Sequence, residues 1–293
     1  MENELSWTNC NTYRTADCVI VGIPDETHSH SLRKGTSNAP DMIRKISRER
    51  DMYVENNVTS LAYTVQGQIK SRIFDLGNIT RESIPKAFEK IIQDGKIPIS
   101  LGGDHSITTQ IIRSIGKKSK PISLVYFDAH PDFLSSTRDF YGSVIYDLLP
   151  YIDTKTSVMI GIRSPEQEEI ENIKKYGIKV ITPFDMEYFG LKQTMNEIFS
   201  IIGKNVYISF DMDCLDPSFA PGVSVPVPLG LDSVKTSLIL KKICSYGIIG
   251  MDIMEICPDY DVQNNTSHLA SRIIGECTAS LNIQQKIPNI ENK

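Results

Sequence analysis

Short apolar segments alternate with longer segments of mixed polarity along almost the whole chain. The apolar segments are rich in Ile and Val and most are too short for helices, which is typical of buried parallel strands. We predict eight such strands, at residues 18–22, 72–77, 97–103, 122–128, 157–162, 178–182, 205–211 and 248–255.

The segments between these strands show the apolar spacing that is typical of helices. In residues 82–95, Ile84, Phe88 and Ile91 lie on one side of a helix, and Gly95 ends it. Similar patterns predict helices at 165–176, 190–202, 233–246 and 266–280. Thr266, followed by Ser267, is a candidate N-cap for the last helix. Strands that alternate with helices predict βαβ units, and therefore a mainly parallel sheet with helices on both faces.

Length and composition fit one large α/β domain. The 293 residues are 40% hydrophobic and 23% charged, as in an ordinary globular protein. Because no linker, repeat or low-complexity segment divides the chain, we expect a single domain over residues 1–293. The net charge of −5, without a Lys/Arg stripe, argues against nucleic acid or a membrane surface as a partner. No apolar segment approaches the roughly 18 residues that a membrane span needs.

The N-terminal segment 1–17 has neither a basic start nor an apolar run, so it shows no sign of a signal peptide. The six cysteines are scattered and form no CxxC pair. We therefore expect free thiols and a cytoplasmic protein.

Polar clusters follow three of the predicted strands, at residues 102–106, 128–132 and 211–217. In an open parallel sheet, ligands bind at the carboxyl ends of the strands. Residues i, i+2 and i+4 of an extended segment point the same way, so Asp128, His130 and Asp132 can converge. The same holds for Asp211 and Asp213.

Four carboxylates gathered at one edge with two imidazoles would destabilise the fold unless cations lie among them. Two divalent ions that share a carboxylate would resolve this. An Asp at a strand end is also common as a turn former or a helix N-cap, and we prefer that role for Asp104, before a helix over 105–116. Three clusters at equivalent strand ends are much harder to explain in this way. The candidate metal ligands are His105, Asp128, His130, Asp132, Asp211 and Asp213.

These motifs resemble those of the ureohydrolases, the family of arginase and agmatinase. The matching segments are GGDHS at 102–106, DAHPD at 128–132, SFDMDCLDPSFAPG at 209–222 and MDIMEICP at 251–258. Weaker matches extend the resemblance over roughly residues 18 to 280. The pair DAHxD and SFDxDxxDP is far more specific than a lone Gly-rich loop, and DCLDPSFAPG looks more like agmatinase than arginase. The resemblance implies an arginase-like, three-layer αβα sandwich.

The resemblance also implies a centre of two Mn²⁺ per chain and a small guanidino substrate. His105 and Asp132 would complete one metal site, His130 and Asp213 the other, with Asp128 and Asp211 as bridges. An oxygen-rich site with one imidazole per ion suits Mn²⁺, whereas structural zinc usually takes more nitrogen or sulfur ligands. The implied reaction is attack of a metal-bridging hydroxide on the guanidinium carbon of agmatine, which releases urea and putrescine. Homo-oligomers are usual in the family.

Four further positions are candidates for catalysis beside the ligand Asp213. Glu255 matches the family carboxylate that holds the guanidinium, and it ends an apolar strand at the same sheet edge, which favours this role over a surface acid. Where family members usually carry a His-Gly pair, this chain has Tyr141 and Gly142. A phenol with a pKa near 10 is a poor proton shuttle at neutral pH. His28 and His30, in the loop after the first strand, are alternative proton relays or ordinary solvated histidines.

A second departure from the family lies in residues 223–230, where aliphatic side chains replace the usual Thr-Gly-Thr-Pro and Gly-Gly pattern. This change favours an alternative, hydrolysis of another guanidino or formimino compound. The missing histidine favours a metal-binding homologue without turnover. A dinuclear phosphoesterase is a weaker alternative, because no Asn or Arg near the motifs is arranged to clamp a phosphate.

Overall fold

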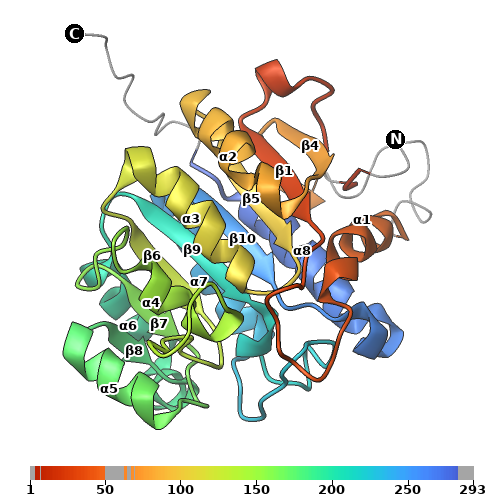
Figure 1. The fold of residues 1–293 in the computed structure, drawn as a ribbon. Helices are drawn as coiled ribbons and strands as arrows, with labels where there is room; N and C mark the ends of the chain where they lie inside the picture. Colours follow the sequence, from red (N-terminus) through yellow and green to blue (C-terminus); the bar gives the residue numbers. More distant parts are fainter. Residues whose placement is uncertain (1–3, 7, 50–62, 65–66, 69, 283–293) are drawn as a thin grey trace, which may run out of the picture.

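A computed structural model describes residues 4–6, 8–49, 63–64, 67–68 and 70–282. Eight parallel strands form one sheet in the order β4-β1-β5-β10-β9-β6-β7-β8 (Figure 1). The strands are β1 (Cys18–Ile23), β4 (Ile73–Asn78), β5 (Ile97–Gly102), β6 (Ser123–Phe127), β7 (Val158–Ile160), β8 (Lys179–Ile181), β9 (Val206–Asp211) and β10 (Gly250–Met254). All eight predicted strands are present, close to their predicted bounds. A small antiparallel pair, β2 (Tyr63–Thr64) and β3 (Gly67–Gln68), stands apart from this sheet.

Helices cover both faces of the sheet, which gives three layers (Figure 1). One face packs against α1 (Ala39–Glu49), α6 (Pro183–Ile201), α7 (Ser233–Tyr246) and α8 (Asn265–Ala279). The other packs against α2 (Ile84–Gln93), α3 (Ser106–Ser119), α4 (Val144–Leu148) and α5 (Gln167–Tyr176). Alternation along β6 shows the principle: Val125 and Phe127 enter the first core, Leu124 and Tyr126 the second. The predicted α/β fold is confirmed.

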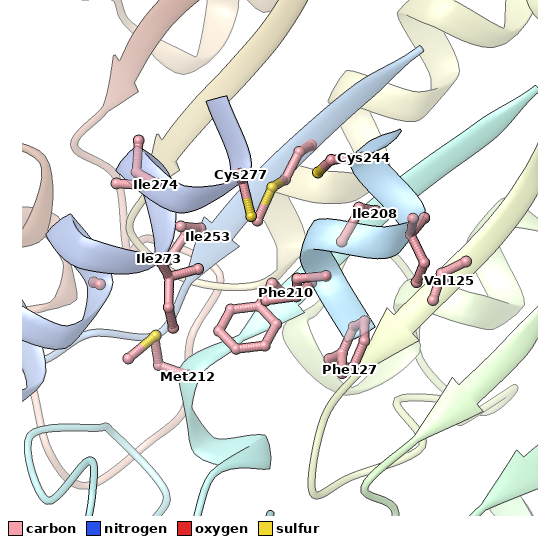
Figure 2. Packing of buried hydrophobic residues seen from close by; sticks show 14 of the residues in the cluster. Val125, Phe127, Ile208, Phe210, Met212, Cys244, Ile253, Ile273, Ile274 and Cys277 are labelled. Atoms are coloured by element: carbon pink, nitrogen blue, oxygen red, sulfur yellow. The ribbon is translucent and has the colours of Figure 1, made fainter. Parts of the chain in front are cut away.

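The core between the sheet, α7 and α8 is shown in Figure 2. Phe127 and Phe210 from neighbouring strands meet edge to face, with ring centroids 5.4 Å apart. Ile273 and Cys277 of α8 pack in the same cluster, as does Cys244 of α7. All six cysteines are free and buried, as expected from their scattered positions. Within the described chain, no helix combines the length and apolar character that a bilayer crossing requires.

Two helices begin earlier than the sequence predicts. α6 begins at Pro183, because Thr182 and Asp185 bond each other's backbone N–H at 2.9 and 3.1 Å. Gly190, where we placed the start, is a kink with φ of 78° inside this helix. α8 begins at Asn265, and the carboxylate of Asp261 accepts the N–H groups of the next two residues at 2.8 Å each. The predicted cap at Thr266 is therefore wrong, because the carboxylate of Asp261 caps the helix instead. The sequence pattern predicts neither α1 nor α4.

Candidate active site

Four central strands end at one edge of the sheet and carry the predicted site. They are β5, β10, β9 and β6, adjacent in that order (Figure 1). His105 follows β5, the 128–132 motif follows β6, Asp211 ends β9 and Glu255 follows β10. Because parallel strands have their carboxyl ends at the same edge, segments far apart in the sequence meet here.

Three carboxylates surround the ring of His105. Its Nδ1 lies 3.0 Å from Oδ2 of Asp128, 3.1 Å from Oδ2 of Asp211 and 3.3 Å from Oδ2 of Asp132. All four side chains are buried. His105, Asp128 and Asp132 present their ligand atoms close enough together to hold one metal ion.

A second group of ligands shares Asp128 with the first. His130 Nδ1 lies 3.1 Å from Oδ2 of Asp213 and 3.4 Å from Oδ1 of Asp128. These three residues could also hold a metal ion. Asp128 thus turns one oxygen to each group, as a bridging carboxylate does. Asp211 faces the first group through Oδ2, whereas its Oδ1 accepts the N–H of Asp213 at 2.7 Å.

His105 is oriented by a chain of hydrogen bonds from the neighbouring strands. Its Nε2 lies 2.9 Å from Oγ of Ser209, and Ser209 donates to Oδ1 of Asp252 at 2.8 Å. Asp252 also accepts hydrogen bonds from Tyr207 and Thr108. Because Ser209 gives its only proton to Asp252, it must accept one from Nε2 of His105. This fixes the tautomer and leaves the Nδ1 lone pair pointing into the first group.

The side chains of the first group have the chemistry of a cation-binding site. With that tautomer, the lone pair of His105 Nδ1 faces three carboxylate oxygens, and Asp128 Oδ2 is buried with no hydrogen-bond donor among the described residues. Buried acceptors that face each other are stable only when a proton or a metal ion lies between them.

The pKa values of the ligands indicate that protons and metal ions compete for this cluster. Burial lowers the pKa of His105, but the carboxylates of Asp128, Asp132 and Asp211 raise it well above its usual value. Burial and the charge of Asp128 raise the pKa of Asp132 to about 7. The cluster therefore holds protons when no metal is bound, and metal binding must displace them.

Glu255 is a buried carboxylate beside the first group. Its Oε1 accepts the N–H of His105 at 2.7 Å, and its Oε2 accepts the hydroxyl of Ser224. No described Lys, Arg or His forms an ion pair with it. Burial, followed by the charge of Asp104, raises the pKa of Glu255 to about 8. The altered 223–230 loop, in which the sequence predicts aliphatic side chains near the substrate, thus still supplies one hydroxyl through Ser224.

Tyr141 lies near both the metal ligands and Glu255. It is half-buried at the start of a short 3₁₀ helix over residues 141–143. Burial raises the pKa of Tyr141, and the charges of Asp132 and Glu255 raise it further. The phenol is therefore even less suited to shuttle protons at neutral pH than a free tyrosine.

The loop that carries His28 and His30 runs beside the site, and the rings of these residues contact Asp139 and Phe140. The backbone N–H of His28 donates to Asp104 at 3.1 Å, and its carbonyl accepts the N–H of Tyr141 at 3.4 Å. Its ring Nδ1 contacts the carbonyl oxygen of Asp139. His30 is exposed and packs its ring on Phe140, with centroids 4.7 Å apart.

Asp104 accepts the N–H of Ser106 at 2.9 Å at the start of α3, which fits its predicted capping role, and it also pairs with Arg81 at 3.4 Å. The sequence interpretation missed the supporting residues Tyr126, Ser209, Ser224 and Asp252. A signal for two of them was present, because Tyr126 and Ser209 stand two residues before Asp128 and Asp211 and so share their strand face.

Comparisons with known proteins agree with this geometry. Residues 16–279 match the Arginase family. Human mitochondrial guanidino acid hydrolase is 32% identical over 286 residues, which cover 90% of this chain and 78% of that protein. Agmatinase of Neisseria meningitidis serogroup C is 32% identical over 272 residues, with coverage of 88% and 85%. The crystal structure of agmatine ureohydrolase of Thermoplasma volcanium aligns with a TM-score of 0.82 at 30% identity, over 95% of this chain and 94% of that one. The chain therefore belongs to the arginase family, whose members are hydrolases of C–N bonds in amidine groups.

Proposed function

We propose that this protein is a dimanganese ureohydrolase that cleaves the guanidinium group of agmatine to urea and putrescine. The observation that carries the proposal is Glu255, a buried carboxylate without an ion-pair partner in the described chain, bonded to the backbone of His105. A buried acid of this kind is stabilised by a cationic ligand, and a planar guanidinium can bind its two oxygens together. Similarity to an agmatinase and to an agmatine ureohydrolase supports agmatine as the substrate.

The ligand groups support manganese. Each combines one imidazole with carboxylate oxygens, a donor set that suits Mn²⁺ better than zinc or copper. When bound, two such cations would supply an activated water as the nucleophile, because cations lower the pKa of the water they bind.

The residues of the chain then have distinct tasks. Glu255 holds the guanidinium, and it is itself held by the N–H of His105 and the hydroxyl of Ser224. Asp213 lies in the second group of ligands, 3.1 Å from Nδ1 of His130, and we assign it to take up and return a proton. Tyr141 stays protonated and can donate a hydrogen bond to the substrate.

Urea release from purified, Mn²⁺-loaded protein tests the proposal. The panel is agmatine, arginine, a guanidino acid and a formimino compound, with formamide as the product measured for the last. We expect urea from agmatine, and its loss in the Glu255→Gln variant. Turnover of only the guanidino acid or the formimino compound would instead identify the alternative hydrolase. A protein that binds two Mn²⁺ and cleaves none of these compounds would be a non-catalytic homologue.

A further inference from the structure

Tyr126 is a buried phenol that lies against the first group of ligands, and the reaction proposed above gives it no task. It belongs to β6, two residues before Asp128, and is fully buried. Its Oη lies 2.5 Å from Oδ2 of Asp132 and 3.1 Å from Nδ1 of His105. Its ring stacks on the imidazole of His105, with centroids 4.8 Å apart and planes 5° from parallel. One side chain thus touches two predicted ligands of the same ion.

The hydrogen bond between these groups has a defined direction. A carboxylate oxygen can only accept, so the single phenolic proton of Tyr126 is donated to Asp132. Nδ1 of His105 keeps its lone pair for a cation, since its other nitrogen is the protonated one. The phenol therefore donates to Asp132 and does not compete with a cation for the Nδ1 lone pair of His105.

Asp132 differs from the other acidic ligands in the donors that hold its carboxylate. Asp128 and Asp211 each accept the N–H of the residue two positions later, at 2.6 and 2.7 Å, and Asp213 accepts the N–H of Ala129 at 3.0 Å. Among the described residues, no backbone N–H donates to the carboxylate of Asp132, which accepts the hydroxyl of Tyr126 and faces Nδ1 of His105 at 3.3 Å. Its backbone is also in the left-handed region, with φ of 47°, which costs energy in a residue with a side chain.

We propose that Tyr126 is a positioning residue for one of the two metal sites. Its phenol fixes the carboxylate of Asp132 and its ring fixes the imidazole of His105, so it sets the affinity of their shared site for its cation. Among the described residues, the contacts of His130 and Asp213 do not include Tyr126, so we expect their site to keep its own affinity. This inference rests on the two-metal centre of the proposed function.

The test is the Tyr126→Phe variant, which keeps the stacked ring and removes only the donor. Chelated protein is titrated with Mn²⁺, with free Mn²⁺ followed by electron paramagnetic resonance and binding heats by calorimetry. We expect wild-type protein to bind two ions and the variant to bind one as before and the other on the order of 10- to 100-fold more weakly. The spin-coupled signal of a Mn²⁺ pair should then appear only at higher Mn²⁺ concentration.

Tyr13→Phe is the matched control. Tyr13 also donates its hydroxyl to a carboxylate, Asp94, at 2.7 Å. Asp94 is not a predicted ligand, lies between α2 and the start of β5 at the opposite edge of the sheet, and keeps Lys90 as a partner when Tyr13 is changed. This variant should still bind two ions with wild-type affinities.

Unchanged affinities in Tyr126→Phe, or an equal weakening at both sites, would overturn the inference. The Asp132→Ala background gives a second, independent answer, because there the phenol has no carboxylate to hold. Addition of Tyr126→Phe to Asp132→Ala should then leave Mn²⁺ affinity unchanged, and a further loss contradicts the inference. Wild-type protein that binds fewer than two ions would instead refute the proposed function.

Discussion

The Glu255→Gln substitution tests whether the negative charge of Glu255 binds the guanidinium, because it removes that charge and keeps the shape of the side chain. In the structure Oε1 accepts the N–H of His105 at 2.7 Å and Oε2 accepts the hydroxyl of Ser224. A glutamine keeps both contacts, because its carbonyl oxygen can accept from His105 and its amide can donate to the Ser224 oxygen. The substitution therefore removes a negative charge and little else, so the fold and the metal content should be retained.

The expected loss follows from the burial of this charge. Removing one partner of a buried, hydrogen-bonded charge pair costs on the order of 2–5 kcal/mol. Such a loss weakens binding of a guanidinium ligand roughly 30- to 5,000-fold. Without a bound ligand, the Glu255→Gln substitution should instead stabilise the fold. The pKa of Glu255 is raised to about 8, so the buried carboxylate destabilises the metal-free fold at alkaline pH and the neutral amide does not.

Calorimetry of agmatine binding, with Mn²⁺ content measured on the same samples, gives the readout. Glu169→Gln is the control, because Glu169 is also buried, accepts two backbone N–H groups at 2.8 and 2.9 Å and has a pKa raised by burial. We expect the control to bind agmatine like the wild type. Wild-type agmatine affinity in Glu255→Gln, with two Mn²⁺ bound, would refute the assignment of Glu255 to the guanidinium.

Three further predictions concern the metals and the missing histidine. Asp128→Asn should reduce bound Mn²⁺ more than Asp132→Asn does, as measured by metal analysis, because Asp128 faces both groups. Thermal unfolding of chelated protein should show stability falling as pH rises from about 4 to 7, since over this range the folded state holds the proton of Asp132, whose pKa is about 7, and the unfolded state does not. Saturating Mn²⁺ should remove this slope. Tyr141→His should raise the rate of urea release up to about 100-fold, whereas a His28→Ala/His30→Ala double variant should lose most activity only if one of those rings relays protons.

The fold was predictable because it depends on patterns that the chain repeats. Segments such as 18–22 and 97–103 are apolar at nearly every position, which is typical of a strand buried on both faces. Helix starts were less predictable, because the capping group can lie outside the apolar pattern. Asp261 is separated from α8 by a short 3₁₀ turn, so the apolar periodicity of the helix does not identify it as the capping residue.

The acidic and histidine side chains at the sheet edge were predictable for a local reason. Asp128 accepts the N–H of His130, and Asp211 that of Asp213, so the spacing of two residues both aligns the side chains and holds them in place. The residues of each motif therefore also form the hydrogen bonds that fix its geometry.

Asp132 and Glu255 differ in this respect, and they show where the sequence stops being informative. Both have left-handed backbones, with φ of 47° and 64°, and neither carboxylate is held by the residue two positions later. Their partners come from elsewhere: a phenol on β6 for Asp132, and the backbone of His105 with the hydroxyl of Ser224 for Glu255. Strained backbone is kept only where surrounding contacts enforce it. These two positions therefore owe their geometry to tertiary contacts, and substitutions at Tyr126 and Ser224 should alter the site even though neither residue belongs to a recognisable motif.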